Sequence, residues 1–231
     1  MLASAQPVRI LAVSDKTVNH LCGPQAQKMV GPVDLLLACG DLSYSYLECL
    51  VTKLHTPHAF FVHGNHDAPE KLKNGQLLSA PGGWQNVDRQ VVSVPQNNLL
   101  IAGLEGSIRY RPGAPYQYTQ QQMRWRAYRL ILPLFWNRVR YGRYVDIFIA
   151  HSPAAGIHAS MDGAHQGFEI LLTLMRHFRP RLFLHGHQHR YGVARWHTQY
   201  AHAHTEIVNV YPFRIIELYP DKIVYGRSYY R

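Results

Sequence analysis

The sequence predicts an α/β protein, and three features of the chain support this fold class. Five short apolar segments each run into polar residues, two segments have amphipathic helical spacing, and the C-terminal region contains further apolar segments separated by proline-containing turns. Short, β-branched apolar segments are typical of buried parallel strands, and open α/β sheets bind ligands beyond the carboxyl ends of such strands. We expect a single domain over residues 1–231, a length near the upper end of what one hydrophobic core supports.

The polar residues that follow the five predicted strands are all potential metal ligands or neighbours of ligands. The strands are Val8–Val13, Val33–Cys39, Ala59–Val62, Val145–Ala150 and Arg181–Leu184. The residues beyond their carboxyl ends are, in the same order, Asp15, Asp41, Asn65-His66-Asp67, His151 and His187-Gln188-His189. Carboxylate, amide and imidazole groups suit divalent first-row metals. Because the carboxyl ends of parallel strands meet at one edge of a sheet, the sequence predicts a metal site there.

The remaining elements are predicted from local pattern. Two strands, Gln90–Val94 and Leu99–Gly103, are expected to pair around the turn at residues 95–98. Apolar residues with spacing i, i+3, i+4 and i+7 predict helices near residues 123–134 and 168–178. The C-terminal strands are expected at Ile207–Val210, Phe213–Leu218 and Lys222–Tyr225, and His202 and His204 are expected on the solvated face of another strand.

Composition and charge narrow the class of protein. Hydrophobic residues make up 47% and charged residues 16% of the chain, which excludes disordered and coiled-coil proteins. No apolar stretch reaches the roughly 18 residues that span a bilayer, so we expect no transmembrane segment and a cytoplasmic protein. The three cysteines, Cys22, Cys39 and Cys49, include no close-spaced pair, and we expect reduced thiols. The net charge of +10 favours anionic partners such as phosphate esters, nucleic acid or acidic lipid.

Four motifs occur in an order that resembles a known enzyme family. The motifs are Gly40-Asp41, Gly64-Asn65-His66-Asp67, His151 and Gly186-His187-Gln188-His189. In this order they resemble the motifs of calcineurin-like metallophosphoesterases, and the resemblance extends from about Val8 to Tyr225. It implies a four-layer αββα sandwich of two mixed β-sheets flanked by helices. It also implies metal-dependent hydrolysis of a phosphomonoester or phosphodiester, since two cations can clamp the ester and activate a water.

The resemblance also implies a role for each motif residue. Asp41 would bridge two divalent ions (Mn, Fe or Zn, with Mn favoured), and the other ligands would be Asp15 and His189 at site one and Asn65, His151 and His187 at site two. The catalytic pair would be His66, which stabilises the transition state or protonates the leaving oxygen, and Asp67, which orients His66. Gly64 and Gly186 would allow close backbone approach.

The first motif departs from the family pattern. The family has Asp-x-His, whereas this chain has Asp15-Lys16-Thr17, so a hydroxyl replaces a site-one imidazole. Site one is therefore expected to hold its metal weakly. His20 lies five residues after Asp15 and is a candidate replacement, although nothing in the sequence secures it.

An arginine- and aromatic-rich helical segment is expected at about residues 106–145. It has no Asp or Glu, and its eight arginines are Arg109, Arg111, Arg124, Arg126, Arg129, Arg138, Arg140 and Arg143. Such a segment either binds nucleic acid by phosphate contacts and stacking or forms a helical cap whose arginines cover an apolar face. Candidate substrate contacts are Arg109, Arg111 and His165, with Asp162 beside the same cleft.

Two alternatives to a small-ester phosphoesterase stay open at this point. One is a nuclease that acts on single-stranded nucleic acid through the arginine-rich segment. The other is a degenerate phosphoesterase that serves as a binding scaffold, which the missing first-motif histidine favours and the intact later motifs oppose. The sequence does not predict the oligomeric state.

Overall fold

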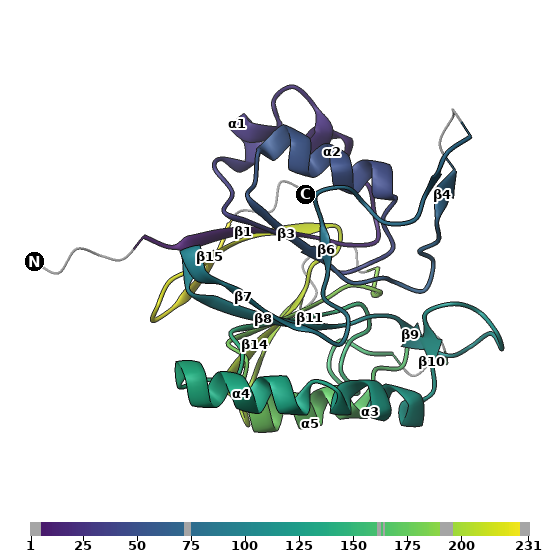
Figure 1. The fold of residues 1–231 in the computed structure, drawn as a ribbon, viewed down its shortest axis with the longest axis vertical. Helices are drawn as coiled ribbons and strands as arrows, with labels where there is room; N and C mark the ends of the chain where they lie inside the picture. Colours follow the sequence, from purple (N-terminus) through teal and green to yellow (C-terminus); the bar gives the residue numbers. More distant parts are fainter. Residues whose placement is uncertain (1–5, 72–74, 161–162, 164, 190–195, 227–231) are drawn as a thin grey trace, which may run out of the picture.

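Two six-stranded mixed sheets pack against each other, and helices cover the outer face of each sheet (Figure 1). The computed structural model describes residues 6–71, 75–160, 163, 165–189 and 196–226. The order of layers is helices, sheet, sheet, helices, which confirms the predicted four-layer αββα sandwich.

The first sheet joins the beginning and the end of the described chain. Its strands, in spatial order, are β16 (Ile223–Tyr225), β15 (Phe213–Leu218), β1 (Val8–Val13), β2 (Leu35–Ala38), β3 (His58–Phe61) and β6 (Gln85–Asn86). Strands β1, β2, β3 and β6 are parallel, whereas β15 pairs with β1 in the antiparallel sense, with Val8 opposite Leu218. The carboxyl ends of β1, β2 and β3 therefore meet at one edge of the sheet.

The second sheet is built in the same way around four parallel strands. Its order is β13 (His197–Tyr200), β14 (Thr205–Asn209), β12 (Leu182–His185), β11 (Ile147–Ala150), β8 (Leu99–Leu104) and β7 (Val91–Val94). Strands β14, β12, β11 and β8 are parallel, and β13 and β7 are antiparallel at the two edges. The predicted pairing of β7 with β8 is confirmed, with the short helix η2 (Pro95–Asn97) between them.

Helices and short ribbons complete the layers. The first sheet is covered by η1 (Asn19–Cys22), α1 (Ala26–Val30) and α2 (Tyr44–Leu54), and the second by α3 (Gln120–Tyr128), α4 (Ile131–Tyr141) and α5 (Glu169–Phe178) (Figure 1). The ribbons are β9 (Ser107–Ile108) with β10 (Gln117–Tyr118), and β4 (Glu70–Lys71) with β5 (Leu77–Leu78). Helices α3 and α4 and ribbon β9–β10 occupy the predicted arginine-rich segment.

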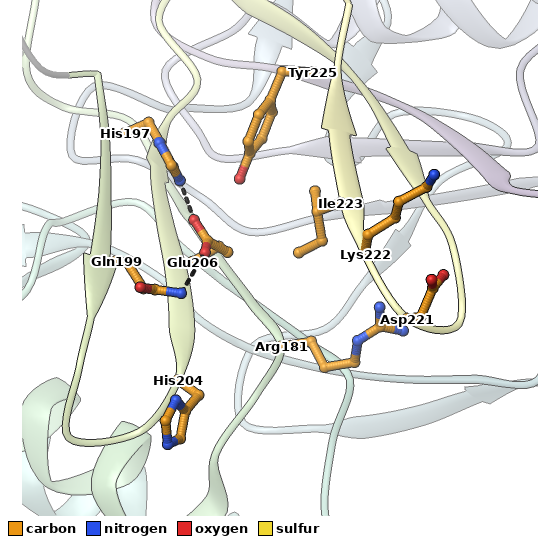
Figure 2. A pocket seen from close by; sticks show the side chains of 9 residues that line it. All are labelled: Arg181, His197, Gln199, His204, Glu206, Asp221, Lys222, Ile223 and Tyr225. Atoms are coloured by element: carbon orange, nitrogen blue, oxygen red, sulfur yellow. Dashed lines mark hydrogen bonds and ion pairs between the residues drawn. The ribbon is translucent and has the colours of Figure 1, made fainter.

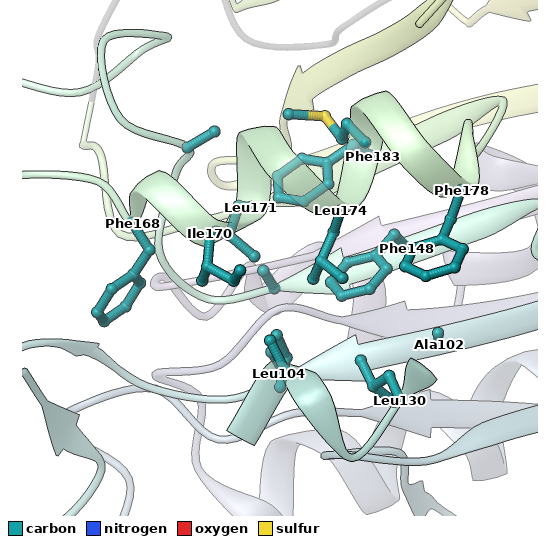
Figure 3. Close-up of a cluster of buried hydrophobic side chains, with 14 of the residues drawn as sticks. Ala102, Leu104, Leu130, Phe148, Phe168, Ile170, Leu171, Leu174, Phe178 and Phe183 are labelled. Carbon is teal, nitrogen blue, oxygen red and sulfur yellow. The ribbon is translucent and has the colours of Figure 1, made fainter. Parts of the chain in front are cut away.

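Strand alternation divides the apolar side chains among three cores. In β1, Leu11 packs with the helices of the first sheet, whereas Ile10 and Ala12 pack between the sheets. In β11, Ile147 and Ile149 face the space between the sheets, whereas Phe148 and Ala150 pack under α3, α4 and α5. Figure 3 shows this third core, with the apolar side of α5 directed at the sheet. Both strands are thus apolar on two faces, which explains their continuous hydrophobic sequences.

Three details of the predicted elements need correction. The helix predicted near 123–134 is divided into α3 and α4, because Pro133 has no N–H to donate to the carbonyl of Arg129. His202 and His204 lie in the turn between β13 and β14 rather than on a strand, and His204 has φ 54°.

The third correction concerns the cysteines. The sulfur atoms of Cys22 and Cys49 are joined as a disulfide, with 5.9 Å between their Cα atoms, while Cys39 is free and buried. The prediction of reduced thiols was wrong for this pair. The two cysteines are 27 residues apart in the sequence, and the packing of η1 against α2 brings them together.

Candidate metal centre

The predicted ligands come together where the carboxyl ends of the two sheets meet. Asp15, Asp41 and Asn65 follow β1, β2 and β3 of the first sheet. His151 follows β11 and His187 follows β12 of the second sheet. The backbone N–H of Gly186 donates to the carbonyl of His151 within the second sheet. The N–H of His187 donates to both carboxylate oxygens of Asp15, and this contact links the two sheets.

Three potential metal ligands converge on the imidazole of His151, which is fully buried. Its Nε2 lies 3.0 Å from Asn65 Oδ1, 3.1 Å from His187 Nδ1 and 3.4 Å from Asp41 Oδ2. Its other nitrogen, Nδ1, donates to the carbonyl of Cys39 at 2.7 Å. That bond leaves Nε2 as the nitrogen directed at the cluster, an arrangement typical of metal-binding histidines.

A second pair of groups lies beside this cluster. His189 Nε2 is 3.3 Å from Asp15 Oδ1, and this hydrogen bond raises the pKa of His189. The carboxylate of Asp15 is inaccessible to solvent, whereas 56% of the His189 side chain is exposed. The imidazole of His189 stacks on the ring of Tyr211 at 4.9 Å, so it forms one wall of the opening to solvent.

The cluster has the charge and the donor atoms that a divalent cation requires. Burial raises the pKa of Asp41, but the charge and hydrogen bond of His151 outweigh burial and lower that pKa to about 2. Burial likewise lowers the pKa of His151, and the carboxylate of Asp41 raises it to about 9. Donor atoms of Asp41, His151 and His187 lie within 4.8 Å of one another. One carboxylate and two imidazoles fit Mn, Fe or Zn.

Glycines and unusual backbone conformations hold the donor groups close together. A Cβ on Gly64 would lie 2.0 Å from Asp41 Oδ1, and one on Gly186 would lie 1.8 Å from Ser14 Oγ, which confirms that both positions require close approach. Asp15, Asp41 and His187 have positive φ values of 64°, 56° and 65°. Residues with side chains rarely adopt this conformation, and such strain concentrates at functional sites.

Comparison with known proteins agrees with this geometry. The sequence profile of the calcineurin-like phosphoesterases matches residues 12–191. The chain belongs to the calcineurin-like phosphoesterase family. Family membership and the cluster around Asp41, His151 and His187 together support a metal-dependent phosphoesterase.

A solved structure shows the same fold as this phosphoesterase. The protein TT1561 of Thermus thermophilus is 19% identical, with a TM-score of 0.61 over 96% of this chain and 99% of that one. A metallophosphoesterase from Sphaerobacter thermophilus is also 19% identical, with a TM-score of 0.38 over 96% of this chain and 89% of that one. No curated protein matches the chain. No helix in the described ranges is both long and apolar enough to cross a bilayer.

The predicted catalytic pair of this phosphoesterase occupies two different environments. His66 is exposed, and its backbone N–H donates to Asp41 Oδ1 at 2.8 Å. Asp67 is buried, and its carboxylate accepts the backbone N–H groups of Gly64, Asp41 and Leu42 at 2.8, 3.2 and 3.1 Å. Within the described part of the chain, no hydrogen bond joins Asp67 to His66. The contacts of Asp67 are therefore those of a group that holds the ligand loops.

Sequence reasoning missed Glu105, which belongs to a buried network behind the Gly64-Asn65 loop. His63 Nδ1 lies 2.9 Å from Glu105 Oε2, and the ring of Tyr116 stacks on His63 at 4.4 Å. Glu105 also accepts from Tyr118 and from Arg126, each through Oε1. Burial raises the pKa of Glu105, but these hydrogen bonds and the Arg126 charge outweigh burial and lower it. Glu105 follows strand β8, so the rule that identified the other strand ends would have identified it too.

The candidate substrate residues have different surroundings. Arg109 donates to Gln122 Oε1 and so contacts α3 rather than the metal cluster, while Arg111 lies 5.8 Å from the ring of Tyr110. Tyr110 itself reaches the cluster, because its hydroxyl accepts from Asn65 Nδ2 at 3.0 Å.

Other predicted positions lie at or beyond the cleft. The ring of His165 packs at 4.9 Å from the ring of His187, which places His165 beside the cluster. Asp162 lies outside the described residues. Thr17 and His20 are exposed, and within the described ranges neither has a hydrogen bond to the cluster.

A separate cavity lies near the amino ends of β12 and β14, away from the metal centre. Figure 2 shows His197 and Gln199 directed at Glu206, with Arg181 and Asp221 across the opening. Both His197 and Gln199 contact Glu206 directly, so its carboxylate is already satisfied within the protein. This cavity contains none of the motif residues.

Proposed function

We propose that this chain hydrolyses a phosphomonoester or phosphodiester with two divalent ions, of which Mn is favoured over Fe and Zn. The observation that carries the proposal is the convergence of an amide oxygen, a carboxylate and a second imidazole on Nε2 of His151. Together with His151, these groups come from four different strand ends and from both sheets. A phosphate ester needs such an array because its nonbridging oxygens are anionic.

The same residues would hold the two ions. Asp41, Asn65, His151 and His187 would form site two, and Asp41 would be shared with Asp15 and His189 at site one. Bound there, the ions would supply Lewis-acid polarisation of the phosphoryl oxygens. Because Thr17 is exposed and has no hydrogen bond to the cluster among the described residues, site one has fewer protein ligands and should bind more weakly.

Other side chains would orient the ligands and act on the substrate. The hydroxyl of Tyr110 accepts a hydrogen bond from the Asn65 amide nitrogen, which turns Asn65 Oδ1 toward the cluster. The exposed imidazole of His66 is available to donate a proton to the leaving oxygen, while its backbone N–H holds the Asp41 carboxylate. Arg111 and His165 would contact the substrate, and Arg109 would support the loop that carries Tyr110.

The contacts of the arginines favour a small ester over nucleic acid. Arg124 pairs with Glu169, Arg126 with Asp88 and Glu105, and Arg143 with Asp146. These three side chains are engaged within the protein, which leaves fewer of the eight arginines for phosphate contacts with a polyanion. A nuclease and a non-catalytic scaffold are therefore the alternatives that the experiment must exclude.

Hydrolysis assays with metal analysis test the proposal. After chelation and addition of Mn²⁺, wild type should hydrolyse p-nitrophenyl phosphate or its bis ester. We expect His66→Ala to retain its metal while turnover falls by roughly 100-fold or more, as for loss of a general acid. Asp41→Asn should lose both activity and metal, because a neutral amide bridges two cations poorly. His202→Ala, in an exposed turn, is the control.

Three outcomes would contradict this function. Inactivity of the Mn-loaded wild type on both esters, with metal bound, would favour a scaffold. Cleavage of single-stranded DNA or RNA in place of the small esters would favour a nuclease. Loss of metal from His66→Ala would show that His66 is a ligand rather than an acid.

A further inference from the structure

Helix α4 is apolar on its outer side as well as on its inner side. Leu134 is buried against the second sheet, as the core requires. The opposite side carries Leu132, Phe135, Trp136 and Val139, which we call the α4 patch, with exposed fractions of 80, 50, 64 and 80%. The spacing i, i+3, i+4 and i+7 places these residues in one stripe, and together they line one shallow hollow. An exposed apolar patch of this kind marks an interaction surface.

A cavity lined by arginines adjoins the α4 patch. Arg138, Arg143, Arg176 and Arg179, which we call the arginine pocket, line a cavity of about 550 Å³ between the end of α4 and the end of α5. Arg138 and Tyr144 line both the hollow and the cavity, so the two features are continuous. No described residue that lines the cavity is acidic. The volume is in the range of small-molecule sites, and four guanidinium groups suit a phosphate.

Within the described part of the chain, three of these four arginines have no acidic partner. Arg143 pairs with Asp146, and Arg176 donates to the hydroxyl of Tyr200. Within the described ranges, neither Arg138 nor Arg179 forms an ion pair, and both are exposed. The cavity therefore carries a net positive charge directly beside an apolar surface.

This combination identifies the occupant by charge complementarity. A second copy of the chain would bring two arginine-lined surfaces together, which is unfavourable. Single-stranded nucleic acid would stack on aromatic rings, but the two most exposed residues here, Leu132 and Val139, are aliphatic. An anionic bilayer offers acyl chains to the aliphatic residues, an interfacial zone to Trp136 and phosphates to the arginines.

We propose that the α4 patch and the arginine pocket form a docking surface for anionic phospholipid bilayers. The patch enters the headgroup–acyl boundary, and the pocket takes a lipid phosphate. Arg143 donates to the carbonyl of Asn98, just before β8, so this surface lies at the amino ends of the strands. The metal centre lies at their carboxyl ends, and docking leaves it open to solvent. The inference does not depend on the proposed hydrolysis.

Vesicle co-sedimentation tests the proposal with the full chain. Wild type should bind vesicles of phosphatidylcholine with one-third phosphatidylglycerol. Its affinity for vesicles of pure phosphatidylcholine should be lower by about tenfold or more. Leu132→Glu with Val139→Glu should weaken binding to the mixed vesicles about tenfold or more. Arg138→Gln with Arg179→Gln removes two charges and should weaken binding to the mixed vesicles by about tenfold or more.

The controls have the same chemical changes elsewhere. Leu77→Glu replaces another exposed leucine, and Lys28→Gln with Lys53→Gln removes two exposed charges from the opposite helical layer. Both should bind within about twofold of wild type. All substituted side chains are exposed, so circular dichroism should show that every variant folds.

Four results would overturn the proposal. Wild type that fails to sediment with anionic vesicles would refute it directly, and equal binding by the patch variants and the controls would refute the assigned surface. Dimers in analytical ultracentrifugation that Leu132→Glu dissociates, without vesicle binding, would show that a second copy covers the patch. Binding of inorganic phosphate or single-stranded RNA that depends on Arg138, without vesicle binding, would assign the pocket to that ligand.

Discussion

Replacing Asp67 by asparagine tests whether this residue holds the ligand loops or orients His66. The carboxylate accepts three backbone N–H groups through its two oxygens, and burial raises its pKa to about 6. At pH 8 it is ionised. An asparagine oxygen can still accept from Gly64 and Asp41, but its NH₂ group then faces the N–H of Leu42. One charge-assisted bond is lost and two are weakened, which costs about 2 to 4 kcal/mol. The raised pKa means that the buried charge itself costs about 3 kcal/mol at pH 8, and asparagine removes that cost.

Thermal unfolding measures this balance, and calorimetry with Mn²⁺ measures the effect on the ligand loops, where binding should weaken because Leu42 loses its partner. For 231 residues, an unfolding entropy of about 2.1 cal/mol/K per residue converts a balance of about 1 kcal/mol in either direction to a Tm within about 2 °C of wild type. The unfolding measurement is made at pH 8 with EDTA, because bound metal would stabilise the folded state and mask the loop. Asp221→Asn, at an exposed carboxylate, is the matched control. If Asp67→Asn kept its affinity for Mn²⁺ and lost activity, Asp67 would act through His66 and the loop assignment would be wrong.

Three further changes test other parts of the structure. Gly186→Ala places a Cβ 1.8 Å from Ser14 Oγ and should weaken Mn²⁺ binding in calorimetry by about tenfold or more. Gly163→Ala, which has open space around its Cβ, is the control and should bind Mn²⁺ as wild type does. Equal affinities of the two variants would show that the backbone at Gly186 shifts to make room. The pKa of Glu105 is lower in the folded protein than in the unfolded chain. Ionised Glu105 therefore stabilises the fold above the unfolded pKa of 4.5, and this stabilisation is lost as the pH falls. Urea unfolding of wild type at pH 7 and pH 4 should show this loss, and Glu105→Gln should reduce it; equal pH dependence in both proteins would contradict the assignment. Thr17→His should raise the affinity of site one for Mn²⁺ and the activity at limiting metal, and two tightly bound ions in wild type would show that another group completes the site.

The site residues at strand ends could be predicted because a strand that is buried on both faces of its sheet has a continuous apolar sequence. Each continuous apolar segment that ends in a polar residue, such as Val8–Val13 before Asp15, marks both a strand and its carboxyl end. Glu105 was missed because β8 was considered only as half of a strand pair. The contacts of Asp67 are with backbone amides, and every residue except proline has such an amide, so no sequence pattern indicates them.

Helix α1 and the cysteine pair depend on tertiary packing rather than on local pattern. Helix α1 has five residues, too few for a helical repeat to be recognised. Cys22 and Cys49 approach each other only because η1 packs on α2. The arginine-rich segment shows the same limit, since its composition does not distinguish Arg126, buried in an ion-pair network, from the exposed Arg138.

The antiparallel pairing of β1 with β15 has a consequence for the order of folding. Val8 pairs with Leu218, so a strand beside the candidate ligand Asp15 is completed by residues synthesised about two hundred positions later. During translation, β2 can emerge and pair with one edge of β1, and β3 can then pair with β2, while the other edge of β1 stays unsatisfied until β15 leaves the ribosome. Contacts this distant in the sequence slow folding. Metal capture by Asp15 is thus expected to follow the emergence of β15, and nascent chains stalled before Phe213 should expose a β1 edge that chaperones can bind.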